Sequence, residues 1–453
     1  MADRTNDQPP ATPKKQGRAR DPGAAMKVRA AESSFAAGQR KFGEEPPVVG
    51  MVLAGAGARG AYEAGVASVL LPVLEECGMR PTVFIGTSAG AINAAHFAAT
   101  AHLTATDSAA AAVELWAGIT KDQVFKPFLQ TALLRDVGQG LAELLRLPGG
   151  PLTSLLDTEP LRNTLATKVD WSRLHENTVD GSRVEAVGVA ATSATTGRTQ
   201  VFVEGQRLKF LRSLSDADRA VDYEPCGLEP KYVQASAAIP VAFPPVHIDG
   251  DWYIDGGVRL NAPLKPALDL GANRLVVIAT DPEHYDPPRP PNGLQARQPT
   301  VQDMIALIMR GALNDRMIED IRTAKKINGL VESARTAGQK AVSRTGHEYR
   351  SVGILFGGPG AGQFGQLGAT ADDVLERDFP PYRLALNPDL AALATLLSAG
   401  QSSGELLSYL FFEPSFLKAA IEHGQDDAQR VVGLARDMAQ RNHGFLRDYL
   451  WTT

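Results

Sequence analysis

VVGMVLAGAGARGAYEAGVASVLLPVLEECGMRPTVFIGTSAGAINAAHFAA, residues 48–99, alternates runs of strand length with runs of helical periodicity. Residues 48–54 are an apolar run that ends in glycines, as a buried parallel strand does. Residues 58–77 carry apolar side chains at helical spacing. Residues 81–85 then predict a second strand, and residues 89–101 predict an alanine-rich helix. This order predicts an α/β fold in which a right-handed crossover makes the strands parallel and brings both strand-to-helix turns to one edge of the sheet.

The rest of the chain has a mixed pattern of elements. Further strands are predicted at residues 184–191, 199–203, 274–279 and 351–356. Mainly helical stretches are predicted at residues 109–178, at 301–331 and from Asp373 onward. We therefore expect a disordered tail over residues 1–45, an α/β core over residues 46–285, and a mainly helical C-terminal extension over residues 286–453 that packs on the core.

Composition limits the classes of partner. The chain has 453 residues, 44% of them apolar, and a formal net charge of -5. It can bury a large core, and its overall charge gives no reason to expect a nucleic-acid partner. Residues 1–45 lack the apolar run of a signal peptide, and no later segment offers the roughly 20 uncharged apolar residues of a membrane span. We expect a cytoplasmic protein, with peripheral membrane contact as an open alternative.

A serine occupies the turn after the second predicted strand. The sequence GTSAG, with Ser88 at its centre, matches the G-x-S-x-G pattern of a nucleophile between a strand and a helix. Gly86 and Gly90 remove side chains that would collide in so tight a turn. The helix that begins at Ala89 directs its positive end to the same point. Ser88 is therefore the candidate nucleophile, and Thr87 and Ala89 complete the elbow.

A glycine-rich loop follows the first predicted strand. Its residues are Gly55, Ala56, Gly57, Ala58, Arg59 and Gly60. The loop matches the dinucleotide pattern G-x-G-x-x-G. A dinucleotide fold also needs an acidic residue at the end of the second strand, but Glu75 and Glu76 come too early and Ser88 lies there instead. Backbone N–H groups in such a loop can hold a developing oxyanion, and we favour that function.

A third block contains an aspartate before two glycines. Residues 235–245 read ASAAIPVAFPP, and Asp255, Gly256 and Gly257 follow shortly after. Alone, such an aspartate usually marks a turn. Together with the two loops, Asp255 is the best candidate for a catalytic base, because glycines allow an aspartate to approach another loop closely.

Together, the three blocks resemble the patatin-like phospholipase family over about residues 48–280. The resemblance implies a three-layer α/β fold with a mainly parallel sheet flanked by helices, plus helical additions. It also implies a Ser/Asp dyad without a catalytic histidine, in which Ser88 is the nucleophile, Asp255 the base and Gly55–Gly60 the oxyanion loop, with Arg59 in the family's basic position. The family usually has three consecutive glycines, whereas this chain has Ala56 in the middle, which disfavours a positive φ there.

The resemblance implies a lipid acyl-ester hydrolase of the phospholipase A, lysophospholipase or acylglycerol lipase type. It would act through an acyl-serine intermediate, and no motif calls for a metal or another cofactor. A carboxylate is a weak base unless a dry pocket raises its pKa or tight positioning assists it. We therefore expect Asp255 and Ser88 to lie within hydrogen-bond reach. The lipid class, the acyl chain length and the oligomeric state are left open.

Two other readings of the same residues stay open. One is an α/β-hydrolase esterase with a triad of Ser88, Asp255 and His284, which follow the chain order of that fold. The other is a non-catalytic protein, either one that binds the phosphate of a nucleotide through Gly55–Gly60 or a catalytically inactive homologue that binds lipid.

Two further segments bear on membrane contact. Residues 322–350 are rich in Lys and Arg and could attract anionic lipid, although a solvated helix face is the favoured interpretation. Residues 406–412 read LLSYLFF and could dock on a bilayer, although packing in the core is favoured.

Overall fold

The computed structural model describes residues 47–127, 154, 156–283, 298, 304, 307, 316–342, 348–360, 363, 365–386, 390 and 403–451. The tail predicted over residues 1–45 and the alternative triad residue His284 lie outside these ranges. Residues 46–453 form one compact unit.

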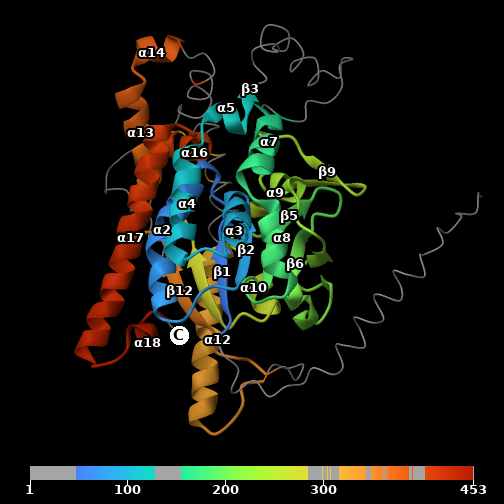
Figure 1. Ribbon diagram of the computed structural model, residues 1–453, viewed down its shortest axis with the longest axis vertical. Coiled ribbons are helices and arrows are strands. Elements are labelled where there is room, and N and C mark those ends of the chain that lie inside the picture. Colours follow the sequence, from blue (N-terminus) through green and yellow to red (C-terminus); the bar gives the residue numbers. More distant parts are fainter. Residues whose placement is uncertain are drawn as a thin grey trace, which may run out of the picture. The chain divides into compact units, whose positions relative to one another are not determined.

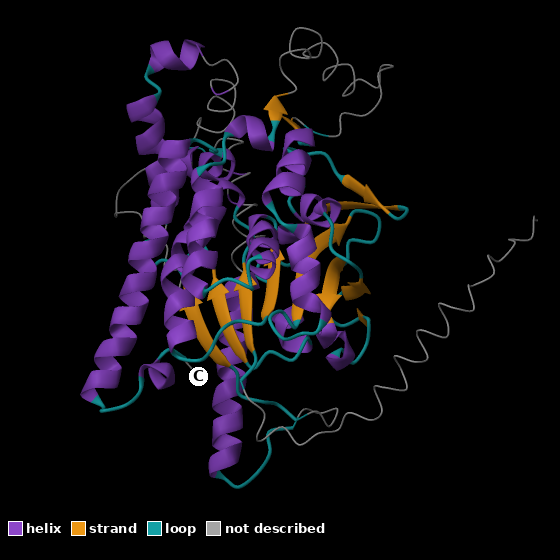
Figure 2. Cartoon of the chain, viewed as in Figure 1, coloured by secondary structure: helices purple, strands orange, loops and turns teal. Residues whose placement is uncertain are grey.

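A twisted sheet lies at the centre of this unit (Figures 1 and 2). Its strands follow the order β12-β11-β1-β2-β5-β6-β8-β7. Their bounds are β1 Val49–Leu53, β2 Val83–Thr87, β5 Ala186–Ser193, β6 Thr199–Gly205, β7 Ser215–Asp216, β8 Val221–Pro225, β11 Arg274–Ile278 and β12 Gly353–Gly357. All neighbours from β12 to β5 are parallel, which confirms the predicted mainly parallel α/β sheet.

Helices flank the sheet on both faces (Figure 2). The chain moves from β1 through α2 to the parallel strand β2, a connection that is right-handed in nearly all folds, and α10 contacts β1, β2 and β11. The helices are α2 Gly60–Glu76, α3 Ala89–Ala99, α4 Ala105–Ala117, α5 Lys121–Val124, α7 Glu159–Lys168, α8 Trp171–Val179, α9 Pro230–Ser236, α10 Leu264–Asp269, α12 Arg316–Thr336, α13 Gln366–Asp378, α14 Pro381–Leu386, α16 Ser403–Leu410, α17 Pro414–Arg441 and α18 Leu446–Tyr449, with short 3-10 turns η1 Gly57–Arg59, η2 Gln206–Phe210 and η3 Gly256–Val258.

Several strands of the structure were not predicted from the sequence. They include β8 and a hairpin of β9 Val246–Ile248 and β10 Asp251–Asp255, which branches from β5. A small separate sheet pairs β3 Lys126–Pro127 with β4 Leu156–Asp157, inside a stretch predicted as mainly helical. These strands are short and mix charged with apolar residues, so they lack the continuous apolar run that revealed the central strands.

Segments late in the chain belong to the same core. β12 pairs in parallel with β11 at the sheet edge, and α17 packs along α2. The helices approach closely at glycines, since a Cβ atom on Gly65 would lie 2.2 Å from the carbonyl oxygen of Ile421. Residues 406–412 are buried, which confirms core packing rather than a bilayer-docking surface.

The basic segment at residues 322–350 forms ion pairs. Lys325 contacts Glu283, and Arg335 and Lys340 pair with Glu332 and Glu348 at 2.7 and 2.9 Å. Contact of this segment with anionic lipid stays an untested alternative to the favoured solvated helix face. No helix within the described ranges combines the length and apolar character that a bilayer crossing requires.

Candidate active site

The register of β5 brings Ser88 and Asp255 together. β2 pairs with the first part of β5 and places Thr87 opposite Ala190. β10 pairs antiparallel with the next part and places Asp255 opposite Ala191. β6 occupies the other edge of β5, so β2 and β10 run towards each other along one edge and meet at their carboxyl ends. Ser88 follows β2 directly and Asp255 ends β10, so the two residues face each other across this junction.

The backbone at Ser88 is strained. Its φ and ψ angles are 55° and -125°, a conformation that non-glycine residues rarely adopt. The Ser88 N–H donates to Oγ of Ser236 at 2.8 Å, and Ser236 Oγ donates to the carbonyl of Ala190 at 2.6 Å. Ser236 therefore ties the serine turn to β5. This residue lies within the ASAAIPVAFPP block, to which the sequence analysis assigned no function.

The glycines around Ser88 permit close backbone contacts. A Cβ atom on Gly86 would lie 2.0 Å from the carbonyl oxygen of Gly90, and one on Gly90 would lie 2.3 Å from that of Leu53. Gly256 is equally constrained, since its Cβ atom would lie 2.2 Å from the carbonyl oxygen of Ala190. Side chains at these positions would force the strand ends apart, which explains why the site needs glycine there.

The carboxyl group of Asp255 is buried beside Ser88. It accepts a hydrogen bond from the Gly257 N–H at 2.7 Å, and the Ser88 side chain lies close enough to favour its charged form. The two residues therefore lie at the same junction, and a hydrogen bond between their side chains stays a prediction. Burial raises the pKa of Asp255 to about 6, while the nearby Ser88 side chain and the hydrogen bond from Gly257 oppose that rise. A carboxyl group with such a pKa is a stronger base than an ordinary aspartate and is still ionised near neutral pH.

The glycine-rich loop forms a turn beside Ser88. The left-handed backbone lies at Gly57, with φ +55°, whereas Ala56 has φ -145°. The alanine that replaces a glycine therefore needs no positive φ. The N–H groups of Gly57 and Ala58 open the 3-10 helix η1, and the first N–H groups of a helix have no acceptor within it. Gly57 lines the same pocket as Ser88, and the role of this loop in holding an oxyanion stays a prediction.

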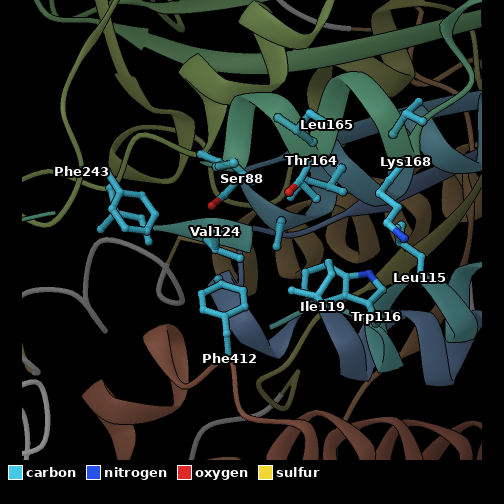
Figure 3. A pocket seen from close by; sticks show the side chains of 17 residues that line it. Ser88, Leu115, Trp116, Ile119, Val124, Thr164, Leu165, Lys168, Phe243 and Phe412 are labelled. Atoms are coloured by element: carbon cyan, nitrogen blue, oxygen red, sulfur yellow. The ribbon is translucent and has the colours of Figure 1, made fainter. Parts of the chain in front are cut away.

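An apolar pocket opens beside Ser88 (Figure 3). Lys168 is the one charged residue among those that line it within the described part of the chain. The lining comes from the serine and glycine-rich turns and from five later segments, and comprises Gly57, Ser88, Ala89, Ile92, Leu115, Trp116, Ile119, Val124, Leu161, Thr164, Leu165, Lys168, Val169, Ala237, Ile239, Phe243 and Phe412. Such a lining suits a hydrocarbon chain.

A buried polar network supports the pocket wall. Nε1 of Trp116 donates to Oδ1 of Asn93 at 2.6 Å, and Nδ2 of Asn93 donates to Oε2 of Glu63 at 2.8 Å. Burial raises the pKa of Glu63 well above its ordinary value, against hydrogen bonds from Asn93 and from the backbone of Ala54. Asn93 thus links the buried Glu63 to Trp116 in the pocket wall.

No group of three or more His, Cys, Asp or Glu side chains in the described ranges is placed to hold a metal ion. The expectation that the protein needs no cofactor stays a prediction.

The fold and this site are typical of α/β hydrolytic enzymes that act on apolar acyl substrates. Residues 51–268 match the family described as patatin-like phospholipase. The chain therefore contains a domain of this family, which confirms the resemblance, and the family supports lipid acyl hydrolysis as its class of activity. The matched region includes both Ser88 and Asp255.

No curated protein matches the chain. Among solved structures, the crystal structure of VipD from Legionella pneumophila matches with a TM-score of 0.29 and 14% sequence identity, over 89% of this chain and 79% of the VipD chain.

Proposed function

We propose that the protein hydrolyses lipid acyl esters with Ser88 as nucleophile and Asp255 as general base. The observation that carries this proposal is that β2 and β10 end at adjacent positions of β5, which places Ser88 beside the buried Asp255, whose pKa burial raises to about 6. Neither residue alone would suffice, because an unassisted serine is a weak nucleophile and an ordinary aspartate is a weak base.

The reaction has two acyl-transfer steps. Asp255 accepts the Ser88 proton while Oγ attacks the ester carbonyl, and the N–H groups of Gly57 and Ala58 stabilise the oxyanion. The protonated Asp255 then gives its proton to the departing alcohol, which leaves an acyl-serine. In the second step Asp255 takes a proton from water, the resulting hydroxide attacks the acyl group, and the fatty acid leaves as Ser88 regains its proton.

The pocket supports an acyl chain as the part of the substrate that is recognised. Phospholipids, lysophospholipids and acylglycerols all carry such a chain, and each fits this proposal. One face of α7 presents Leu161, Thr164, Leu165 and Lys168 to the cavity at helical spacing (Figure 3).

The nucleophile test measures hydrolysis of p-nitrophenyl acyl esters of increasing chain length, with chelator present. We expect Ser88→Ala and Asp255→Ala to lose at least about 1,000-fold in kcat, because each removes a member of one catalytic unit. His284→Ala should keep wild-type activity. Loss of activity in His284→Ala would favour the triad alternative, and activity that survives Ser88→Ala would overturn the proposal.

The pocket test uses two tryptophans on one helix. Leu165→Trp fills the pocket, whereas Ala166→Trp places the same ring on the exposed side of α7. We expect Leu165→Trp to lower kcat/KM at least about tenfold for long acyl chains and much less for short ones, because only long chains need the filled volume. The Ala166 variant should resemble the wild type. An equal loss for all chain lengths would show that the acyl chain binds elsewhere.

A further inference from the structure

The side chain of Arg59 connects the glycine-rich loop to α16. Its Nε atom donates to Oγ of Ser408 at 2.8 Å, and its Nη2 atom donates to Oε1 of Glu405 at 2.7 Å. The same nitrogen donates to the backbone oxygen of Glu405 at 3.1 Å. α16 lies far outside the region that matches the family, so a later part of the chain holds the end of this loop.

The charges of Arg59 and Glu405 are both buried, so the loss of one leaves the other in an unfavourable environment. The side chain of Arg59 is 1% exposed, and that of Glu405 is 9% exposed. Burial would lower the pKa of Arg59, but Glu405, Tyr409 and Asp281 together raise it above its ordinary value. Asp281 lies 3.8 Å away, so Glu405 is the closer counter-charge. A guanidinium without such a partner would leave its buried position for water.

The backbone of the loop also lies directly against α16. A Cβ atom on Gly57 would lie 2.3 Å from the carbonyl oxygen of Tyr409, and the guanidinium of Arg59 stacks 4.1 Å from the centre of the Tyr409 ring. Gly57 carries the left-handed turn and one of the N–H groups assigned to the oxyanion. Any shift of Arg59 relative to α16 therefore moves that N–H group relative to Ser88.

We infer that Glu405 is a positioning residue for catalysis: through Arg59 it holds the oxyanion loop in the shape that the reaction needs. This inference rests on the proposed function. It makes α16 a part of the active site although the helix supplies no reacting group. Because an oxyanion donor acts only in the transition state, a displaced loop should lower kcat while KM stays nearly unchanged.

The test compares two buried carboxylates of the C-terminal extension. Glu405→Gln keeps the shape and removes the charge that faces Arg59. Asp427→Asn makes the same change on α17, where Oδ2 of Asp427 accepts a hydrogen bond from Tyr62 at 2.8 Å and Oδ1 from Arg430 at 3.1 Å. Removing one oxyanion donor typically costs about 100- to 1,000-fold in kcat, so we expect Glu405→Gln to lose at least about tenfold with KM within about twofold.

Asp427→Asn should lower the Tm and leave kcat unchanged. Glu405→Asp, which restores the charge at shorter reach, should recover part of the activity, and Ser408→Ala should lose less than Glu405→Gln. Ser408→Ala also provides a milder variant if Glu405→Gln does not fold. Wild-type kcat in folded Glu405→Gln or, where that variant does not fold, in Ser408→Ala would overturn the inference, as would equal losses in the Glu405 and Asp427 variants.

The rate at which a fluorophosphonate labels Ser88 separates this inference from the proposed function. We expect the wild type to label quickly and Glu405→Gln at least about tenfold more slowly, because the phosphonate also needs the oxyanion donors. If an active wild type and Glu405→Gln label at the same rate, the role of Glu405 is refuted and the proposed function is not. A wild type that neither labels at Ser88 nor hydrolyses esters would refute the proposed function and this inference with it.

Discussion

The buried environment of Asp255 affects both the catalytic rate and the stability of the fold. The same burial that raises its pKa to about 6 makes it useful as a base and costly to the fold. Both consequences can be measured, one in the pH dependence of the rate and one in the pH dependence of stability.

The rate should follow the ionisation of Asp255. The base accepts a proton only when it is deprotonated, so kcat/KM should be level above about pH 7 and fall towards tenfold per pH unit below a pKa near 6. The measurement is ester hydrolysis from pH 4.5 to 8, with return to pH 8 as the control for acid damage. If kcat/KM instead falls with an apparent pKa near 4, Asp255 titrates in the working enzyme as an ordinary exposed carboxylate.

Stability should change in the opposite sense. The folded-state pKa of Asp255 lies above the ordinary aspartate value of about 3.9, so its contribution to stability is most favourable below that value and is lost as pH rises through about 6. Asp255→Asn stays neutral and should therefore be more stable than the wild type at pH 8, by up to about 3 kcal/mol, with a smaller gain at pH 5. Urea unfolding at the two pH values measures this difference. A gain that is equal at both would contradict the assigned pKa.

At the scale of elements, the contact between α2 and α17 depends on small residues. A Cβ atom on Gly424 would lie 2.2 Å from the carbonyl oxygen of Tyr62, whereas one on Gly433 of the same helix would meet nothing within 4 Å. Glycine at position 424 therefore permits the close approach of the two helices, whereas glycine at position 433 of α17 permits no such contact.

We expect opposite effects of alanine at these two positions. Gly424→Ala should destabilise the fold by about 1–3 kcal/mol, because the added methyl group separates the two helices. Gly433→Ala should stabilise it by about 0.5–1 kcal/mol, because alanine loses less backbone freedom in a helix. Thermal or urea unfolding distinguishes the two. Stabilisation by both would mean that the helices do not approach as closely as described.

At the scale of the whole molecule, the predicted boundary at residue 285 can be tested by truncation. A chain of residues 46–285 lacks β12, which pairs with β11, and α16, which binds Arg59. It also lacks α17, which packs on α2. We expect it to lose cooperative unfolding and activity, because the loss of these contacts exposes apolar surface and leaves the Arg59 charge without its partner. Residues 46–453, tested in parallel, should fold. A folded and active 46–285 chain would show that the extension is dispensable.

The central part of the fold was readable in the sequence because its signals are local. The strand–helix–strand–helix unit follows from periodicity, and Ser88 was found because a strained turn between strand and helix requires glycines at fixed offsets. Asp255 was found through its two glycines and through the family resemblance. The short strands β8, β9 and β10 were missed, since so few residues carry too little periodicity to identify a strand.

By itself, the sequence determined the type of fold, the candidate nucleophile and the candidate base, because turn chemistry and apolar periodicity depend on neighbours along the chain. Only the tertiary structure decided that β2 and β10 meet on one edge of β5, that Asp255 is buried enough to raise its pKa, and that Arg59 pairs with Glu405, 346 residues away. Burial and charge pairing depend on what packs around a group, and these packing partners come from distant parts of the chain that only the completed fold brings together.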